Sequence, residues 1–599
     1  MSSRVRAAGL VVLAAVAAYA NSLGNGLAYD DTWVLGANPI VTEGRFGEVL
    51  TTPYWPKAVP GTGNYRPLTV ASFAAEWQLF DGSTTALHAV SVGAHAVASL
   101  AVFAFLAGLT GVLGGLVGGL FFAVHPVHVE AVANLVGRAE PYAALFVVGA
   151  VLVYRRTGEG SPAVRALGIL GVAVLYALGL ASKEIAVTLP GLLLAVAVLD
   201  PGARGKLADR IRRVLPHLVV LGAVLVAYLV VRTSVLGVIT GESPAAGLRD
   251  LSRTERLFTA LSIWPQYLRL MILPWDLSMD YQPAVLPLAR SVTLGTAVGA
   301  LVLGALGVTA WRLRRTDPDG ALGLVWFFVA VLPVSNLLVR SDILLAERTL
   351  YLPSVGAALV LAAVARRIAA SDDARLRRGA LVLALAATAA LMVRTVTRNP
   401  TWMDTFTALS TLAEEHPESY MALRSRAAGY ERVGSADEAA AVYATAMAMV
   451  PDDYTLTLEV GDFHARQGRR AEALDLYRRA IALIPSHPAA YQRQGVELIR
   501  DGRYDQARTA LLEGLRRSAF PDRQLWSLLS ESWIGRGDLE AAVRARRAAL
   551  GVDVESREDW RRLAELYEAM GRTREAAEAR QREAAAPEAS DDPAPRRIS

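Results

Sequence analysis

The sequence predicts an all-α membrane protein, in which a helix bundle of about 11 membrane crossings precedes an α-solenoid of short helical repeats. Residues 1–398 are long apolar blocks rich in Ala, Leu, Val and Gly, separated by short charged links. Residues 399–599 instead carry dense Arg, Glu and Ala at helical spacing. Within that second part, Pro, Gly and Ala recur every 34 residues. These observations predict one apolar and one polar helical domain.

Composition narrows the class of protein further. A chain of 599 residues is too long for one hydrophobic core. The net charge is only +5, and the Arg clusters lie between apolar blocks, so membrane topology accounts for them and no nucleic-acid partner is expected. The absence of cysteine excludes disulfides, thiolate metal sites and a cysteine nucleophile. The preference for Ala, and for Arg over Lys, is typical of a GC-rich bacterial genome.

Eleven apolar runs are close to the length that crosses about 30 Å of hydrocarbon. Arg4 and Arg6 place the N-terminus in the cytoplasm by the positive-inside rule, and four later Arg clusters fall on the same side. Eleven crossings then carry the C-terminal half to the periplasm, which predicts a multi-pass protein of the bacterial inner membrane. The runs are 5–23, 86–107, 110–124, 141–154, 166–181, 185–199, 214–231, 292–311, 321–338, 352–368 and 380–396.

Three segments of this half need an interpretation of their own. Residues 257–275 are apolar and aromatic, but a crossing there would move the later Arg clusters outside, so we expect a re-entrant or surface-lying helix. Residues 18–20 (AYA) resemble a signal-peptidase site, but ten further runs favour a retained first helix. The closely spaced glycines Gly114, Gly115, Gly118 and Gly119 predict close helix packing.

With this topology, the polar residues gather on the outer side. They comprise Asp30, Asp31, Lys183, Glu184 and the segments 64–69, 125–140 and 344–353. The cytoplasmic links hold mostly Arg without evident partners. This distribution suits a reaction at the outer membrane surface. A transporter should instead carry polar groups through the mid-membrane on related halves, and the membrane half shows no internal repeat.

The second half has the period of tetratricopeptide repeats. We predict a linking helix at 399–415, about five repeats over 416–586, and a disordered Pro- and charge-rich tail at 587–599. Such repeats stack into a superhelix whose concave face binds extended peptide or a partner domain. The 34-residue spacing links Pro417, Pro451 and Pro485; Gly434, Gly468 and Gly502; Ala439, Ala473 and Ala507; and, after a slip of one residue, Gly537 with Gly571 and Ala542 with Ala576.

Six motifs occur in a fixed order: YDD, YRPLT, HPVHVEAVANLVGRAE, SKE, AERTLYLPSVG and RNPTW. Together they resemble the transmembrane and tetratricopeptide-repeat O-mannosyltransferase-like family of GT-C glycosyltransferases, over nearly the whole chain. The resemblance implies a GT-C-type bundle over 1–398. It also implies an inverting transferase that moves a sugar from polyprenyl phosphate to a hydroxyl on the non-cytoplasmic side. The nearest characterised relatives transfer mannose to protein hydroxyls, so a periplasmic protein, presented by the repeats, is the expected acceptor.

This chemistry needs a base for the acceptor hydroxyl and positive charge for the departing phosphate. The base is expected to be Asp30 or Asp31, and the family resemblance favours Asp30. On a helix, neighbours point about 100° apart, so one acid is expected to face the site while the other orients or caps. The alternative is that the pair only caps a surface helix.

The donor phosphate is expected to bind among Arg138, Arg348, Lys183 and Arg66, since Arg grips phosphate oxygens at two points. The alternatives are snorkelling to the interface and pairing of Lys183 and Arg348 with their chain neighbours Glu184 and Glu347. Candidates for binding sugar or acceptor are Glu130, Glu140, His128 and Tyr351.

The histidines suggest a metal site only weakly. His125 and His128 are three residues apart, a spacing that could ligate a metal, but Pro126 lies between them and no third ligand is apparent. Hydrogen bonding within the fold is the favoured interpretation, as it is for His88 and His95 on one face of the second predicted helix. We therefore expect no metal and no cofactor, with the lipid-linked sugar as a substrate.

Two other functions stay open. A catalytically silent scaffold could be anchored by the membrane half and recruit partners through the repeats. A GT-C transferase or ligase could instead act on a lipid or glycan acceptor.

Overall fold

The computed structural model describes residues 2–55, 63–158, 160–203, 205–237, 247–249, 251–341, 343–518, 521–552 and 556–586. Within these ranges all regular structure is helical, as predicted, and no strand occurs. The chain divides into two compact units. Apart from Gly63, which groups with the second unit, the described residues up to Ser425 form the first unit and those from Arg426 onward form the second. The tail predicted to be disordered, 587–599, lies outside the described residues.

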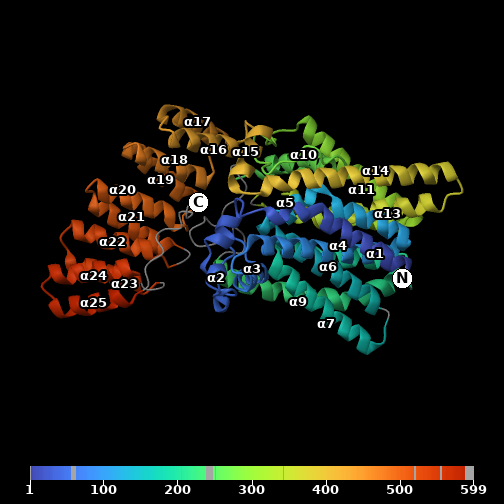
Figure 1. Cartoon of the computed structure of the whole chain (residues 1–599), viewed down its shortest axis with the longest axis horizontal. Helices are drawn as coiled ribbons and strands as arrows, with labels where there is room; N and C mark the ends of the chain where they lie inside the picture. Colours follow the sequence, from blue (N-terminus) through green and yellow to red (C-terminus); the bar gives the residue numbers. More distant parts are fainter. Residues whose placement is uncertain are drawn as a thin grey trace. The chain divides into compact units, whose positions relative to one another are not determined.

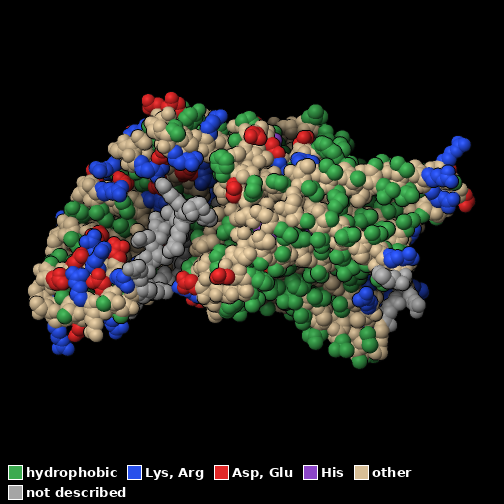
Figure 2. Space-filling view, viewed as in Figure 1, with side chains coloured by type: hydrophobic (Ala, Val, Ile, Leu, Met, Phe, Trp, Pro, Cys, Tyr) green, Lys and Arg blue, Asp and Glu red, His purple; other side chains and the backbone are tan. Residues whose placement is uncertain are grey.

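The first unit is a bundle of long helices that lie side by side (Figure 1). Hydrophobic side chains cover the flank of this bundle, and Lys and Arg gather at helix tips (Figure 2). An apolar flank with charge at its ends is the pattern expected where helices face lipid. The long helices are α1 Ser3–Tyr19, α4 Thr84–Val124, α6 Ala139–Thr157, α7 Pro162–Ser182, α8 Leu189–Leu199, α9 Leu207–Leu236, α10 Arg253–Ile272, α11 Leu294–Thr316, α12 Pro318–Val331, α13 Ser354–Ala369 and α14 Ala374–Arg398.

Seven helical stretches among the described residues are long and apolar enough to cross a membrane, and two shorter apolar helices accompany them. Each of the eleven predicted runs overlaps a helix, although 321–338 extends past Val334, where the last helical turn ends. The runs 86–107 and 110–124 both lie in α4, whose backbone leaves the helical conformation at Gly111, with φ of +81°. The count of eleven crossings stays a prediction. The 257–275 segment forms α10, which is not among the seven.

Close packing through glycine, predicted for α4, is confirmed. A Cβ added at Gly118 would lie 2.5 Å from the carbonyl oxygen of Ala358 on α13, and one at Gly114 would lie 2.7 Å from that of Ala362. These distances leave no room for a side chain, so the two helices approach backbone to backbone.

Three arginines of the predicted cytoplasmic links, Arg155, Arg366 and Arg367, have acidic partners that the sequence did not suggest. Arg155 pairs with Asp200 at 2.6 Å. Arg366 pairs with Asp317 at 3.0 Å and also with Asp319. The sequence did not suggest these pairs because the acids lie far from the arginines in the chain, at the end of α8 and the start of α12.

The helices that follow are paired as tetratricopeptide repeats predict. In the pairs α18–α19, α20–α21, α22–α23 and α24–α25 the two helices pack on each other. Glycine stands with φ between +71° and +78° in each of these four turns, and Gly434, between α16 and α17, has φ of +81°; all five lie at positions predicted from the 34-residue period. The helices are α15 Thr405–Glu415, α16 Tyr420–Arg432, α17 Ala436–Met449, α18 Tyr454–Arg466, α19 Arg470–Leu483, α20 Pro488–Arg500, α21 Tyr504–Arg517, α22 Arg523–Gly535, α23 Leu539–Leu550, α24 Arg557–Ala569 and α25 Thr573–Ala585.

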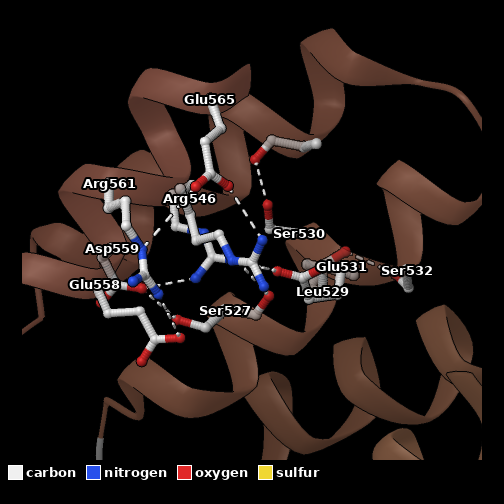
Figure 3. A network of polar contacts seen from close by, with 12 residues as sticks. Ser527, Leu529, Ser530, Glu531, Ser532, Arg546, Glu558, Asp559, Arg561 and Glu565 are labelled. Atoms are coloured by element: carbon white, nitrogen blue, oxygen red, sulfur yellow. Dashed lines mark hydrogen bonds and ion pairs between the residues drawn. The ribbon is translucent and has the colours of Figure 1, made fainter. Parts of the chain in front are cut away.

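A buried polar network joins three of these helices (Figure 3). Arg546 of α23 donates to Asp559 of α24 and to Glu531 of α22, both at 2.7 Å. The Ser527 hydroxyl donates to the same Asp559 carboxylate at 3.0 Å. Arg546 and Asp559 are almost fully buried, and a buried charge is tolerated only where its partners are present. The network therefore fixes how one repeat stacks on the next.

Candidate active site

The predicted outer motifs meet in pairs at one end of the bundle. Asp31 of YDD accepts hydrogen bonds from the backbone N–H groups of Leu135 and Val136, in the segment 125–140. These contacts join positions more than a hundred residues apart in the chain. They show that the polar side chains converge as the one-sided distribution predicts.

Asp31 is a buried structural carboxylate. Its oxygens accept from Val136 N at 2.8 Å, Ala28 N at 3.2 Å and Leu135 N at 3.3 Å. Burial raises its pKa to about 7, against the three N–H donors, which lower it. The adjacent Asp30 is only half-buried. Asp31 therefore orients the loop, and Asp30 is the acid left with access to solvent.

YRPLT and SKE are neighbours in the fold. Pro67 opens the short helix α3 (Pro67–Leu79), a position where the missing N–H costs nothing. The Thr69 hydroxyl donates to the Ser182 carbonyl at 3.0 Å, at the end of α7. Arg66, just before α3, pairs with Glu184 at 2.9 Å.

The cations pair across the fold and not with their chain neighbours. Lys183 pairs with Glu140 at 2.5 Å. Arg348 pairs with Glu130 through its guanidinium, and its backbone N–H donates to the same carboxylate at 2.9 Å. The alternative pairs Lys183–Glu184 and Glu347–Arg348 are therefore wrong. Glu130 and Glu140 are almost fully buried, and they act as anchors for the two cations.

Tyr54 is a buried residue on which several of these charged groups act. Burial raises the pKa of its hydroxyl above the usual range, Arg66 and Arg348 lower it, and Asp30 and Asp31 raise it. The Arg66 guanidinium also lies 4.8 Å from the Tyr54 ring centroid. Two guanidinium groups and the two adjacent acids thus act electrostatically on one tyrosine.

Lys183 belongs to the same electrostatic group. Burial lowers its pKa, Glu140 raises it, and Arg66 and Arg348 lower it again. Arg66 and Arg348 keep 13% and 24% of their side-chain surface exposed, so both can be reached from outside. We call Asp30, Arg66, Lys183 and Arg348 the charged cluster.

Arg138 does not belong to the charged cluster, and the prediction that it binds phosphate needs correction. It is fully buried, and it donates to Ser91 Oγ at 2.9 Å, to the Leu87 carbonyl and to Glu76. Its guanidinium is occupied by core acceptors, so it fixes the packing of α3 on α4. Sequence reasoning missed Glu76; its signal is that it is the single charged residue of α3.

The other two candidates for sugar or acceptor binding also lie inside the bundle. His128 Nε2 bonds to Ser354 Oγ at 2.9 Å, and the Tyr351 hydroxyl bonds to His95 Nδ1 at 2.7 Å. All four side chains are fully buried. The role predicted for His128 and Tyr351 is thus corrected to holding the turn that carries Arg348.

The remaining histidines hydrogen-bond within the fold, as predicted. His88 Nε2 lies 3.1 Å from the Gly26 carbonyl, and His125 Nε2 lies 3.2 Å from that of Met271. Burial lowers the pKa of His125 to about 4, so its ring is neutral near pH 7.

Two features of the cluster were not found from the sequence. Tyr54 gave no signal, because it stands in a polar loop outside every motif. Its hydroxyl is buried and has no hydrogen-bond partner among the described residues. Glu347, next to Arg348, accepts from Tyr281 Oη at 2.7 Å and Ser278 N at 2.6 Å, and the sequence suggested only a local ion pair for it.

Chemically, the charged cluster combines the partly exposed carboxylate of Asp30 with three cations, each of which already pairs with a glutamate. Asp30 can accept a proton from a hydroxyl placed beside it. Arg66, Lys183 and Arg348 can stabilise an anionic leaving group at the same place. The cluster therefore suits the transfer of a group from an anionic carrier to a hydroxyl.

Comparison with known proteins gives matches to both halves of the chain. A family model described as the cilia and flagella-associated protein 70 middle TPR-like domain matches residues 423–586. Protein O-mannosyl-transferase TMTC3 from mouse is 25% identical over 93% of this chain and 65% of its own length. Human TMTC1 is 25% identical over 83% of this chain and 57% of its own length, and F38B6.6 of Caenorhabditis elegans is 23% identical over 66% and 55%.

The chain thus spans between about half and two thirds of the length of these relatives. Among solved structures, MamA 41-end from Desulfovibrio magneticus RS-1 covers 28% of this chain and 93% of its own, with 21% identity and a TM-score of 0.25, too low to bear on function. The curated homologues of the chain are transmembrane and tetratricopeptide-repeat O-mannosyltransferases, as the ordered motifs predict.

Proposed function

We propose that the chain is an integral-membrane glycosyltransferase of the GT-C class that transfers a sugar from polyprenyl phosphate to a hydroxyl of a protein. In this proposal the repeats present the acceptor protein. The observation that carries the proposal is the charged cluster, in which the partly exposed Asp30 belongs to the same electrostatic group as Arg66, Lys183 and Arg348, on four of the ordered motifs. The relatives' name, protein O-mannosyl-transferase, makes mannose the sugar to test first. The protein would lie in a bacterial inner membrane with this end toward the periplasm.

The reaction assigns a role to each group. The acceptor oxygen attacks the anomeric carbon, and its proton passes to Asp30. The bond between that carbon and the phosphate oxygen breaks on the opposite face, so the configuration inverts. The phosphate leaves on its lipid, and Arg66, Lys183 and Arg348 stabilise its charge. Lys183 has three N–H donors and gives one to Glu140, so it keeps donors for a phosphate oxygen.

No metal or cofactor is needed in this proposal. The donor is a monophosphate rather than a sugar nucleotide, so no divalent ion is required to hold a diphosphate. Transfer should persist in EDTA. A loss that Mn²⁺ or Mg²⁺ restores would contradict the metal-independent mechanism.

The test is a transfer assay in membranes with labelled polyprenyl-phosphate mannose and a protein acceptor. Removal of a general base lowers rates by about 10²–10⁴-fold, so Asp30→Asn should fall by at least about a hundredfold while its amount in the membrane stays constant. The matched control is Asp276→Asn, which neutralises an exposed acid outside the charged cluster. Full activity of Asp30→Asn would exclude the base assignment. A parent protein that transfers no sugar to any acceptor would favour a non-catalytic scaffold.

A further inference from the structure

The RNPTW motif has no role in the mechanism above, although it contacts the loop that carries Asp30. Asn399 of this motif is fully buried. Its side-chain amide donates to the Ala18 carbonyl at 2.8 Å and to Asn21 Oδ1 at 2.6 Å. In return, Asn25 Nδ2 donates to the Asn399 carbonyl at 3.2 Å. One asparagine thus holds three points of the segment that leads from α1 to YDD.

The contacts advance along both segments toward Asp30. Gly26 N donates to the Met403 carbonyl at 2.8 Å. Tyr29 N donates to the Thr405 hydroxyl at 2.8 Å. Residues 399–405 and residues 18–29 therefore run side by side, and the last bond of the series reaches the residue directly before Asp30.

Tyr29 is a residue whose backbone needs such a bond. Its φ is +50°, a conformation that residues other than Gly, Asn and Asp seldom adopt, and it persists only where neighbours impose it. Two hydroxyls do so here, because Thr32 Oγ1 donates to the Tyr29 carbonyl at 2.7 Å and Thr405 Oγ1 accepts from its N–H. The peptide groups on both sides of Tyr29 are thus fixed, and with them the direction of Asp30.

We propose that Thr405, the first residue of α15, is a positioning residue for Asp30, and that residues 399–405 clamp the loop that carries this acid. The catalytic part of this inference rests on the proposed function, whereas the clamp rests on the hydrogen bonds alone. Thr405 touches no reacting atom. It acts through Tyr29, and a misplacement of a reacting group by about 1 Å can cost about a hundredfold in rate.

The first test measures transfer. Thr405→Val keeps the side-chain shape and removes the hydroxyl acceptor, so kcat should fall by about tenfold or more while KM for the lipid-linked donor stays unchanged. Thr405→Ser restores the acceptor and should restore kcat. In an Asp30→Asn background, Thr405→Val should cause no further loss. The matched control is Thr411→Val on the same helix, whose hydroxyl donates only to the Thr407 carbonyl within α15.

The second test does not depend on transfer. The chain has no cysteine, so Asp30→Cys introduces a single thiol, and its alkylation by N-ethylmaleimide can be timed in detergent. Adding Thr405→Val should raise that rate by at least about threefold, because the loop opens more often. Adding Thr405→Ser or Thr411→Val should leave it unchanged. Thr405→Ala serves in place of Val if the Val variant does not fold.

The outcomes separate the two proposals. Equal alkylation rates with and without Thr405→Val would overturn the clamp. An additional loss of transfer by Thr405→Val in the Asp30→Asn background would overturn the positioning role. Faster alkylation in a protein that transfers no sugar would sustain the clamp and reject the proposed function.

Discussion

Asp31 accepts three backbone hydrogen bonds in the protein interior, whereas the adjacent Asp30 is half-buried within the charged cluster. The difference arises because neighbouring side chains of one turn point in different directions, and only one can face the core. The sequence predicted this division of labour between the two acids. It could not show which acid took which part without help from the family resemblance.

The two acids should therefore respond differently to the same substitution. Asp31→Asn turns an NH₂ group toward a backbone N–H, and leaving a buried donor unsatisfied costs about 1–3 kcal/mol. The free energy of unfolding should fall by that amount, seen as a lower thermal midpoint in detergent. Asp30→Asn should leave the midpoint close to that of the parent. Equal midpoints for the two variants would contradict the structural role of Asp31.

Glu347 gives a pH dependence whose sign can be worked out. Burial raises its pKa to about 8, partly offset by Arg398 and by its hydrogen bonds, whereas a glutamate in an unfolded chain titrates at about 4.3. Between these values the folded protein binds more protons than the unfolded chain, so stability falls as pH rises from about 4 to about 8. Glu347→Gln keeps an acceptor for Tyr281 and removes this titration.

The measurement is the thermal midpoint of parent and Glu347→Gln from pH 5 to pH 9. The midpoint of the parent should fall more steeply with pH than that of the variant over this range. Glu414→Gln, on the exposed face of α15, is the matched control and should follow the parent. Parallel curves for parent and Glu347→Gln would count against a proton on Glu347.

At the scale of elements, glycine decides how closely helices approach. The sequence predicted that Gly114, Gly115, Gly118 and Gly119 serve packing, because small residues at this spacing form a flat helix face. It could not predict the partner. The structure shows that Gly114 and Gly118 face α13, which begins more than two hundred residues later.

Gly118→Ala should destabilise the bundle, since its Cβ would lie 2.5 Å from the Ala358 carbonyl oxygen. Overpacking of this kind costs about 1–3 kcal/mol. Gly93→Ala, on the same helix, meets no atom within 4 Å and should cause no loss. Thermal midpoints of the two variants in detergent check the contrast. A midpoint for Gly118→Ala equal to that of Gly93→Ala would mean that α4 and α13 can separate without cost.

At the scale of the whole molecule, the chain forms two compact units. The proposed function divides the work between them, with chemistry in the first and presentation of the acceptor by the repeats. A chain that ends at residue 425 keeps the whole first unit, and with it α15 and the Thr405 contact. It should transfer sugar to a short hydroxyl peptide at about the parent's rate but lose at least about tenfold toward a folded protein acceptor, because tethering of the acceptor is gone.

The assay of the truncated chain compares the two acceptors in the same membranes. Equal rates on the protein acceptor with and without the repeats would remove presentation from their proposed role. Loss on both acceptors would show that the first unit needs the repeats for more than presentation.

The sequence by itself determined the helical class, the repeat period with its turn glycines, and the apolar runs that became helices. These properties follow from hydrophobicity and backbone preference over stretches of a few turns, so local sequence suffices to predict them. The ordered motifs also indicated which polar residues would lie near one another in the fold.

The tertiary structure alone decided which charges meet. Arg66 pairs with Glu184, which is 118 residues away in the chain, and Arg348 pairs with Glu130, which is 218 residues away. It also places Arg138 in the core and the Thr405 hydroxyl within hydrogen-bonding distance of Tyr29 N, next to Asp30. Electrostatic attraction does not depend on sequence order, so a carboxylate could pair with any cation of the chain. The partner is selected by the packing of helices that are distant in the sequence.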